Sequence, residues 1–503
     1  MTIARIFTRA SVGIEAPEVV VEAHISNGLP AFSIVGLPET TVRESRDRVR
    51  SALINSRFEF PARRITINLA PADLPKEGGR FDLAIALSIL TASGQLESTK
   101  MSQFEFLGEL ALNGELRPVS GILPAAIHCA LAQRSLVVPK DNEREAALPG
   151  KTAVYAADHL LQVVSHLNGQ EKLPLIPVCR SQQQSRVDVA DISEVKGQQV
   201  AKRALEIAAS GGHNLLMVGS PGAGKTLLAS RYPGLLPELN KEAAMQVAAI
   251  HSVADHIRPI EQWLTPPYRA PHHTASAVAL VGGGSNPKPG EISLAHQGVL
   301  FLDELPEFER KVLEVLREPL EAGKIVISRA ARQVVYPASF QLIAAMNPCQ
   351  CGLKGHPTKH CRCSPDQVKR YRNKISGPLL DRIDLHINVQ PNTRELMSKT
   401  DENVESSEQI RTRVVKSRER QYNRQGCLNS ELSIKRLEQV CQLNSTSNEI
   451  MRKAIDKLGL SGRAYHRIIK IARTIADMVS DERIESSHIM EAIGYRQLDR
   501  ETE

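Results

Sequence analysis

The order of apolar and polar positions predicts an α/β domain over residues 1–168. Apolar residues alternate with polar ones over residues 19–25 and 65–69, and a period of two is typical of strands with one buried face. Apolar residues at helical spacing predict helices over residues 40–56, 81–90 and 122–131. Strands that alternate with helices favour an α/β fold for this part of the chain.

A second pattern follows a linker predicted over residues 169–190, which is rich in proline and glutamine. The apolar runs at residues 214–218, 298–302 and 340–346 are continuous, as in strands that are buried on both faces of a parallel sheet. Residues 191–392 are therefore expected to form an α/β domain with a parallel sheet.

Shorter elements lie between and after these strands. A helix is expected over residues 311–320 and a hairpin over residues 323–336, with Arg329 and Arg332 at its tip. Residues 393–503 are expected to form a helical domain, since the helical period recurs over residues 406–424, 463–478 and 486–493.

The loop between the first buried strand and the next helix carries a phosphate-binding motif. It matches G-x-x-x-x-G-K-[ST] with Gly219, Ser220, Pro221, Gly222, Ala223, Gly224, Lys225 and Thr226. Glycines let backbone N–H groups surround an anion, and the start of the helix adds a positive dipole. Lys225 is expected to contact the outer phosphates of ATP and Thr226 to contribute a hydroxyl to Mg²⁺.

Polar side chains follow the next two buried strands. Asp303 and Glu304 directly follow the run at residues 298–302, and Asn347 directly follows the run at residues 340–346. Ligands of open α/β sheets bind at the carboxyl ends of the strands. Asp303 is therefore expected to hold Mg²⁺, Glu304 to polarise the attacking water, and Asn347 to orient that water or the terminal phosphate.

Four of the eight cysteines cluster just after this strand, as Cys349, Cys351, Cys361 and Cys363. Four thiolates can form a closed tetrahedral Zn²⁺ site. Free thiols in a reducing compartment remain the alternative. The segment has few apolar residues with which to build a core, and this favours a metal.

Composition narrows the cellular setting. No apolar run approaches the 18 residues of a membrane span, and the first residues lack the apolar core of a signal peptide, so a cytoplasmic protein without membrane association is expected. The net charge is +7, and residues 305–382 hold 14 Lys and Arg against 7 Asp and Glu. This local excess indicates either a polyanionic partner or a solvated basic face.

The first domain resembles the catalytic domain of Lon-type proteases in two stretches, residues 75–82 and 114–123. In that family a serine stands at the position of Arg80 and a lysine at the position of Leu123. A serine–lysine dyad needs both groups. The resemblance therefore implies a Lon-like fold without peptidase activity.

The remainder resembles the magnesium-chelatase-like branch of AAA+ ATPases. The similarity includes the phosphate-binding loop, the two acids, the insert at residues 269–276, the hairpin, Asn347 and the segment 377–384. Joined to a Lon-like domain, this arrangement is similar to the ComM/YifB family over essentially the whole chain. The resemblance implies a homo-hexameric, ATP-driven DNA motor of the helicase or branch-migration kind, used in recombination or natural transformation.

The same resemblance assigns further residues. Arg382 would be an arginine finger for the neighbouring subunit's site, Arg463 would be sensor 2 on a C-terminal helical lid, and Arg329 and Arg332 would contact DNA in a central pore. Two alternatives stay open: a chelatase-type motor that acts on protein partners without DNA, and an ATP-dependent protease, which Arg80 disfavours.

Overall fold

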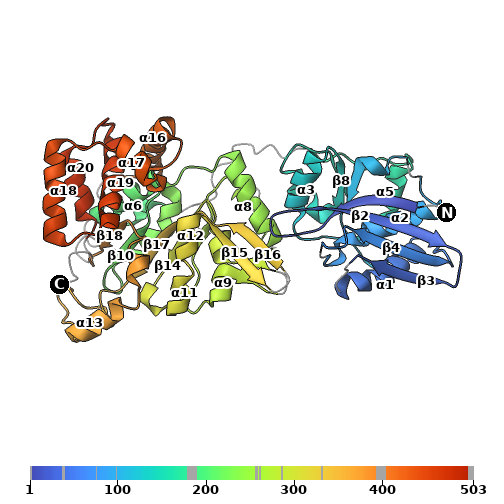
Figure 1. Ribbon diagram of the computed structural model, residues 1–503, viewed down its shortest axis with the longest axis horizontal. Helices are drawn as coiled ribbons and strands as arrows, with labels where there is room; N and C mark the ends of the chain where they lie inside the picture. The colour runs from blue at the N-terminus through green and yellow to red at the C-terminus, as the bar shows by residue number, and fades with distance from the viewer. Residues whose placement is uncertain are drawn as a thin grey trace. The chain divides into compact units, whose positions relative to one another are not determined.

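The chain divides into two compact units, and each is described by itself. The first comprises residues 1–184 and 248–260, and the second comprises residues 185–247 and 261–503. The structure is a computed structural model, which describes residues 3–36, 40–74, 76–97, 99–177, 190–254, 256, 259, 262–284, 287–329, 332–391 and 404–496 (Figure 1). Among the helices so described, none has the length and apolar character needed to cross a bilayer.

The first unit is built on a seven-stranded mixed sheet in the order β3-β4-β2-β1-β5-β8-β9. Its long strands form an antiparallel group, in which β2 pairs with β1 on one side and with β4 on the other. The remaining pairs are parallel. The strands are β1 (Ile3–Arg9), β2 (Glu18–Ser26), β3 (Ala31–Val35), β4 (Arg64–Ala70), β5 (Phe104–Phe106), β8 (Ser135–Pro139) and β9 (Val154–Ala157).

Helices of the first unit cover this sheet and complete its core. The central one, α2 (Asp82–Ala92), is apolar on all sides, and ten of its residues are buried. A helix that is apolar all round belongs inside a domain. The other helices are α1 (Thr40–Asn55), α3 (Ile122–Leu131), α4 (Glu143–Ala147) and α5 (Leu160–Leu167).

The second unit contains a five-stranded sheet in the order β11-β14-β17-β10-β18, with every pair parallel. The parallel arrangement places the carboxyl ends of all five strands at one edge. The three central strands are fully buried on both faces, as their continuous apolar runs predict. The strands are β10 (Leu215–Val218), β11 (Tyr268–Arg269), β14 (Val299–Leu302), β17 (Gln341–Met346) and β18 (Leu385–Asn388).

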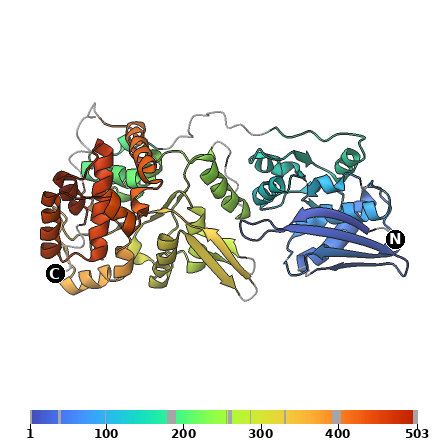
Figure 2. The same cartoon turned by 45° about the horizontal axis from the view of Figure 1, so that its top comes forward.

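Helices of the C-terminal part pack together and beside α6 (Gln199–Gly211), as Figures 1 and 2 show. One core joins α6, strands β10 and β17 and these helices, through residues such as Leu205, Met217 and Ile468. The helices are α16 (Ser407–Gln425), α17 (Ile434–Val440), α18 (Ser445–Leu458), α19 (Gly462–Val479) and α20 (Ser486–Gly494). The predicted fold class, α/β with a parallel sheet and a helical C-terminal part, is confirmed.

One predicted element is wrong in detail. The helix expected over residues 311–320 is two short helices, α11 (Arg310–Glu314) and α12 (Arg317–Ala322). Pro319 has no N–H to donate to the carbonyl of residue 315, so a continuous helix cannot form there. The expected hairpin does form, from β15 (Lys324–Arg329) and β16 (Arg332–Pro337), and pairs Ile325 with Tyr336.

Candidate nucleotide-binding site

The phosphate loop, residues 219–226, connects β10 to α7 (Lys225–Arg231) at the carboxyl edge of the sheet. Gly222 and Gly224 have φ angles of 77° and 91°, and a Cβ atom at either would meet nothing within 4 Å. The left-handed backbone requires glycine there, and the space beside it is open. Gly219 is needed for a different reason, because its Cβ would lie 2.2 Å from the carbonyl oxygen of Val389.

Lys225 lies at the first position of α7, and its side chain is turned back over the loop. Its Nζ donates to the carbonyl oxygens of Gly219 at 2.7 Å and Ser220 at 3.0 Å, and to Oδ1 of Asn347 at 3.2 Å. Only 8% of the residue is exposed. Burial lowers the pKa of Lys225, while Asp303 and Glu304 act in the opposite direction. The negative charge of a bound phosphate would likewise favour the protonated form of Lys225, so the site suits phosphate.

Thr226 and Asp303 meet across the gap between the loop and β14. Oγ1 of Thr226 donates to Oδ2 of Asp303 at 2.6 Å. A hydroxyl and a carboxylate are oxygen ligands of the kind that Mg²⁺ takes alongside phosphate oxygens and water. These two residues fit a magnesium ion that is held together with a nucleotide.

Glu304 follows Asp303 in a strained backbone conformation, with a φ angle of 51°. Non-glycine residues seldom occupy this left-handed region, and such strain is concentrated at functional sites. Its carboxylate oxygen lies 3.3 Å from Nδ1 of His273. The ring of His273 also packs against that of His272, with centroids 4.1 Å apart and the ring planes tilted by 33°.

The sequence motifs alone do not predict the contact of His273 with Glu304, because they give the insert at residues 269–276 no role at this site. The sequence does contain a signal for it. His273 follows β11 by four residues, and β11 pairs in parallel with β14, the strand that leads to Glu304. Both segments therefore leave the sheet at the same edge.

Asn347 directly follows β17, which lies between β14 and β10 in the sheet. Its amide oxygen accepts from Lys225, as described above. The structure thus brings together five of the residues singled out from the sequence: Lys225, Thr226, Asp303, Glu304 and Asn347. They come from the ends of two adjacent strands, β14 and β17, and from the start of α7, the helix that follows the next strand, β10.

The two predicted arginines have other partners. Arg382 is 8% exposed, and its guanidinium contacts Glu321 and the carbonyl oxygen of Pro378. Arg463, at the second position of α19, lies 3.7 Å from a carboxylate oxygen of Asp381 and is largely exposed. The roles of Arg382 and Arg463 stay predictions. An arginine finger acts on the nucleotide of a neighbouring subunit, so contacts within one chain do not test it.

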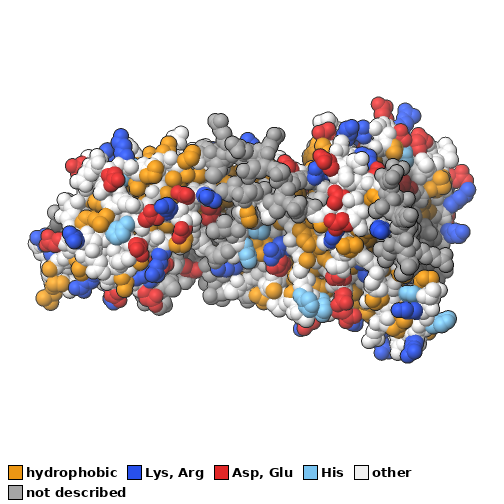
Figure 3. Space-filling model, turned by 180° about the vertical axis from the view of Figure 1, so that it is seen from behind, with side chains coloured by type: hydrophobic (Ala, Val, Ile, Leu, Met, Phe, Trp, Pro, Cys, Tyr) orange, Lys and Arg blue, Asp and Glu red, His pale blue; other side chains and the backbone are white. Residues whose placement is uncertain are grey.

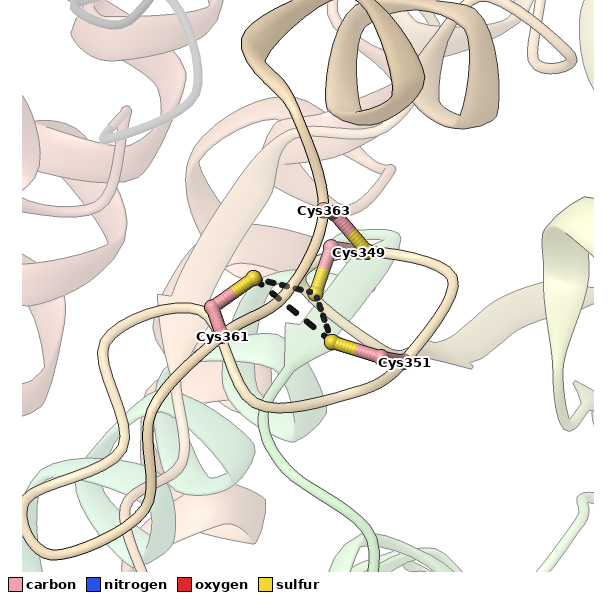
Figure 4. A group of neighbouring side chains, drawn as sticks. All are labelled: Cys349, Cys351, Cys361 and Cys363. Atoms are coloured by element: carbon pink, nitrogen blue, oxygen red, sulfur yellow. Dashed lines mark hydrogen bonds between the residues drawn. The ribbon is translucent and has the colours of Figure 1, made fainter.

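The four clustered cysteines converge, and we call residues 349–363 the four-cysteine loop (Figure 4). Their Sγ atoms all lie within 4.8 Å of one another. The Sγ–Sγ separations are 3.4 Å for Cys349–Cys351, 3.6 Å for Cys349–Cys361 and 3.5 Å for Cys351–Cys361. Four sulfur atoms at such distances fit a single tetrahedral ion, whereas the sulfurs around a cluster of several metal ions lie farther apart.

Backbone N–H groups point at these sulfur atoms. The N–H of Lys354 lies 3.4 Å from Sγ of Cys349. Those of Leu353 and Arg362 lower the pKa of the Cys351 thiol to about 6. Hydrogen bonds of this kind surround metal-bound thiolates.

The hairpin tip predicted to contact DNA is described only in its backbone. Arg329 and Arg332 face each other as the last pair of the β15–β16 register, and the hairpin is a two-stranded sheet of its own (Figure 2). Their side chains lie outside the described structure. Over the face drawn in Figure 3, Lys and Arg side chains are interspersed with Asp and Glu.

In the first unit, Arg80 and Leu123 stand at the two positions of the Lon-type serine–lysine dyad, and both are buried. Nη2 of Arg80 donates to the carbonyl oxygen of Ser120 at 2.8 Å, and burial lowers the pKa of Arg80 to about 10. Leu123, in the first turn of α3, is fully buried. Neither residue offers a nucleophile or a general base for peptide hydrolysis.

Comparison with known proteins agrees with this geometry. Three family descriptions match: magnesium chelatase subunit ChlI over residues 191–397, subunit ChlI of Mg-chelatase over residues 21–142, and the C-terminal part of subunit ChlI over residues 404–496. The fold is that of a magnesium-chelatase-type AAA+ domain.

Relatives extend the likeness to the full length. Competence protein ComM of Haemophilus influenzae is 52% identical over 99% of this chain and 98% of its own, and protein YifB of Escherichia coli is 50% identical over the same shares. The 38 kDa magnesium-chelatase subunit of Chlorobaculum parvum is 25% identical over 43% of this chain and 56% of its own. The chain belongs to the ComM/YifB family.

Proposed function

We propose that the chain is an ATPase that moves along DNA as a homo-hexameric ring in the cytoplasm. The ATPase part rests on the hydrogen bond from Thr226 to Asp303 at 2.6 Å. Beside it, Nζ of Lys225 donates hydrogen bonds to Gly219 and Asn347. These contacts bring a phosphate-binding cation and the oxygen ligands of Mg²⁺ to one point at the sheet edge.

Each residue has a separate task in this proposal. Lys225 and the N–H groups of the phosphate loop would hold the β- and γ-phosphates, while Thr226 and Asp303 would hold Mg²⁺. Glu304 would accept a proton from the attacking water, and Asn347 would orient it. Arg382 of one subunit would stabilise charge at the next subunit's site, and Arg463 would sense nucleotide from the helical part. Mg–ATP itself supplies the phosphoryl group whose transfer to water releases free energy.

DNA as the substrate rests on two supports. One is the likeness to a protein named for competence, which favours a role in natural transformation or recombination. The other is the hairpin, whose tip places Arg329 opposite Arg332. Two arginines per subunit, repeated around a ring, would hold phosphates without reading base sequence.

The alternative is a chelatase-type motor that acts on protein partners, and it is favoured by the matches to magnesium-chelatase subunits. The rate of ATP hydrolysis separates the two functions. It is measured without DNA and with single-stranded, duplex, forked and four-way-junction DNA. We expect stimulation by at least one form, and a flat response to all of them would favour the chelatase-type motor.

A double variant locates the DNA contact. Replacing Arg329 and Arg332 with alanine should weaken DNA binding, reduce the dependence of affinity on salt and remove the stimulation, while DNA-free hydrolysis stays near that of the wild type. Alanine at Arg452 and Lys457 of α18 is the matched control, because both residues are exposed and the change removes the same charge elsewhere. An unchanged affinity and salt slope in the hairpin variant would place the DNA contact away from the hairpin.

The proposal includes Zn²⁺ at Cys349, Cys351, Cys361 and Cys363, on the strength of their sulfur separations. A tetrahedron with metal–sulfur bonds of about 2.3 Å has edges of about 3.8 Å. The separations among Cys349, Cys351 and Cys361, 3.4–3.6 Å, are close to that edge. Elemental analysis of protein purified without chelator is expected to give about one Zn²⁺ per chain, as a mononuclear tetrahedral site requires.

A further inference from the structure

The four-cysteine loop touches the phosphate loop at one point. A Cβ atom built on Gly352 would lie 2.5 Å from Cδ and 2.8 Å from Cγ of Pro221. It would also lie 3.9 Å from Cγ of Asn347. Gly352 is buried, although the cysteine before it is exposed. The backbone of the cysteine loop therefore packs directly on the ring of Pro221.

The loop is also joined to the site through its own start. Cys349 comes two residues after Asn347, whose amide accepts from Lys225. The four-cysteine loop thus borders the phosphate loop at Pro221 and the Lys225–Asn347 contact. A change in its conformation would therefore displace atoms at both places.

We propose that the metal-bound four-cysteine loop is a clamp that positions the phosphate loop and Asn347 for ATP. This inference rests on the proposed nucleotide and Zn²⁺ sites and adds a coupling between them. Residues 349–363 place many polar residues and few apolar ones around the sulfurs, so without a metal little else would hold Gly352 against Pro221. Loss or oxidation of the thiolates would release that contact.

Two glycines of the loop provide a matched pair for the test. Gly352 has a φ angle of 75° and Gly355 has 77°, so alanine suffers similar backbone strain at both. Only at Gly352 does the added Cβ meet Pro221, whereas at Gly355 it meets nothing within 4 Å. A difference between Gly352→Ala and Gly355→Ala therefore reports the contact with the phosphate loop.

The two variants are compared with the wild type by Zn²⁺ content, ATP affinity and hydrolysis without DNA. Gly352→Ala is expected to keep its metal and to lose about 10²-fold in kcat/KM, as a displacement of about 1 Å at a site can cause. Gly355→Ala should stay within about twofold of the wild type, because its Cβ has no contact to disturb. Equal values for the two variants would overturn the clamp.

A second substitution shortens the side chain of Pro221, which the Cβ added at Gly352 would meet. Pro221→Ala deletes the Cγ and Cδ atoms that the new Cβ would meet. In the Pro221→Ala background, adding Gly352→Ala should cost little further activity. A full second loss would show that Gly352→Ala acts by unfolding the loop, and would also overturn the clamp.

The metal is tested separately with Cys361→Ser, which removes one ligand. It should lower the Zn²⁺ content and weaken ATP binding in the same direction as Gly352→Ala. Unchanged ATP affinity in the metal-free variant, or a wild-type protein without metal, would refute the metal's part. A wild type that binds no ATP would instead refute the proposed function, whatever its metal content.

Discussion

Lys225→Ala and Glu304→Gln are expected to separate ATP binding from hydrolysis. Nζ of Lys225 donates to two carbonyl oxygens of the phosphate loop, at 2.7 and 3.0 Å, and to the amide oxygen of Asn347 at 3.2 Å, so it is already positioned where phosphate oxygens would lie. The side chain of Glu304, in contrast, is half exposed and contacts His273. The first substitution removes a cation from the phosphates, and the second removes a base from the water.

The size of the first effect follows from the hydrogen bonds lost. A hydrogen bond to a charged group contributes about 1.5–3 kcal/mol, and two to phosphate oxygens about 3–6 kcal/mol. Each 1.4 kcal/mol corresponds to about tenfold, so Lys225→Ala should weaken ATP by about 10²- to 10⁴-fold. Glu304→Gln should change affinity by less than about threefold and slow hydrolysis by about 10²-fold or more, as loss of a general base does.

Titration of a fluorescent ATP analogue with Mg²⁺ measures the affinities, and phosphate release measures hydrolysis. Lys241→Ala is the matched control, since Lys241 also begins a helix, α8 (Lys241–Val253), but is exposed. Thermal melting checks that the three variants are folded. Equal loss of affinity in Lys225→Ala and Glu304→Gln would refute the separate roles assigned to the two residues.

Three further outcomes are expected. Arg382→Ala should leave ATP affinity near that of the wild type and slow hydrolysis by about 10³-fold, and mixing it with Lys225→Ala subunits should restore some activity; no recovery in any mixture would place Arg382 outside the subunit interface. His273→Ala should raise DNA-free hydrolysis by at most about fivefold. A partly exposed pair such as His273–Glu304 contributes about 0.2–1 kcal/mol, and breaking it frees Glu304. A lower rate would mean that His273 helps Glu304 act as a base. Purified protein should not cleave an unfolded polypeptide with or without ATP, and cleavage that a substitution at Ser120 abolishes would contradict this.

Much of the candidate nucleotide site could be predicted because its residues lie directly after buried strands or at the start of the helix that follows one. The phosphate loop must follow a buried strand and begin a helix, and both are visible as an apolar run and a glycine-rich motif. Asp303 and Asn347 stand at the ends of the next two buried runs, and parallel strands bring such ends to one edge. Periodicity also located α3 and the β15–β16 hairpin, since each depends on contacts close in sequence.

The sequence by itself therefore determined which residues are the candidates for holding phosphate, magnesium and a metal ion between four sulfurs. Only the tertiary structure decided which of them touch residues far along the chain. His273 meets Glu304, Arg382 meets Glu321, and Gly352 packs on Pro221. Periodicity and motif spacing carry no information on such contacts, because they depend on how loops leave the sheet and fill the space above its edge. The physical reason is that backbone hydrogen bonding is repetitive and readable along the chain, whereas side-chain packing between distant loops is particular to the folded molecule.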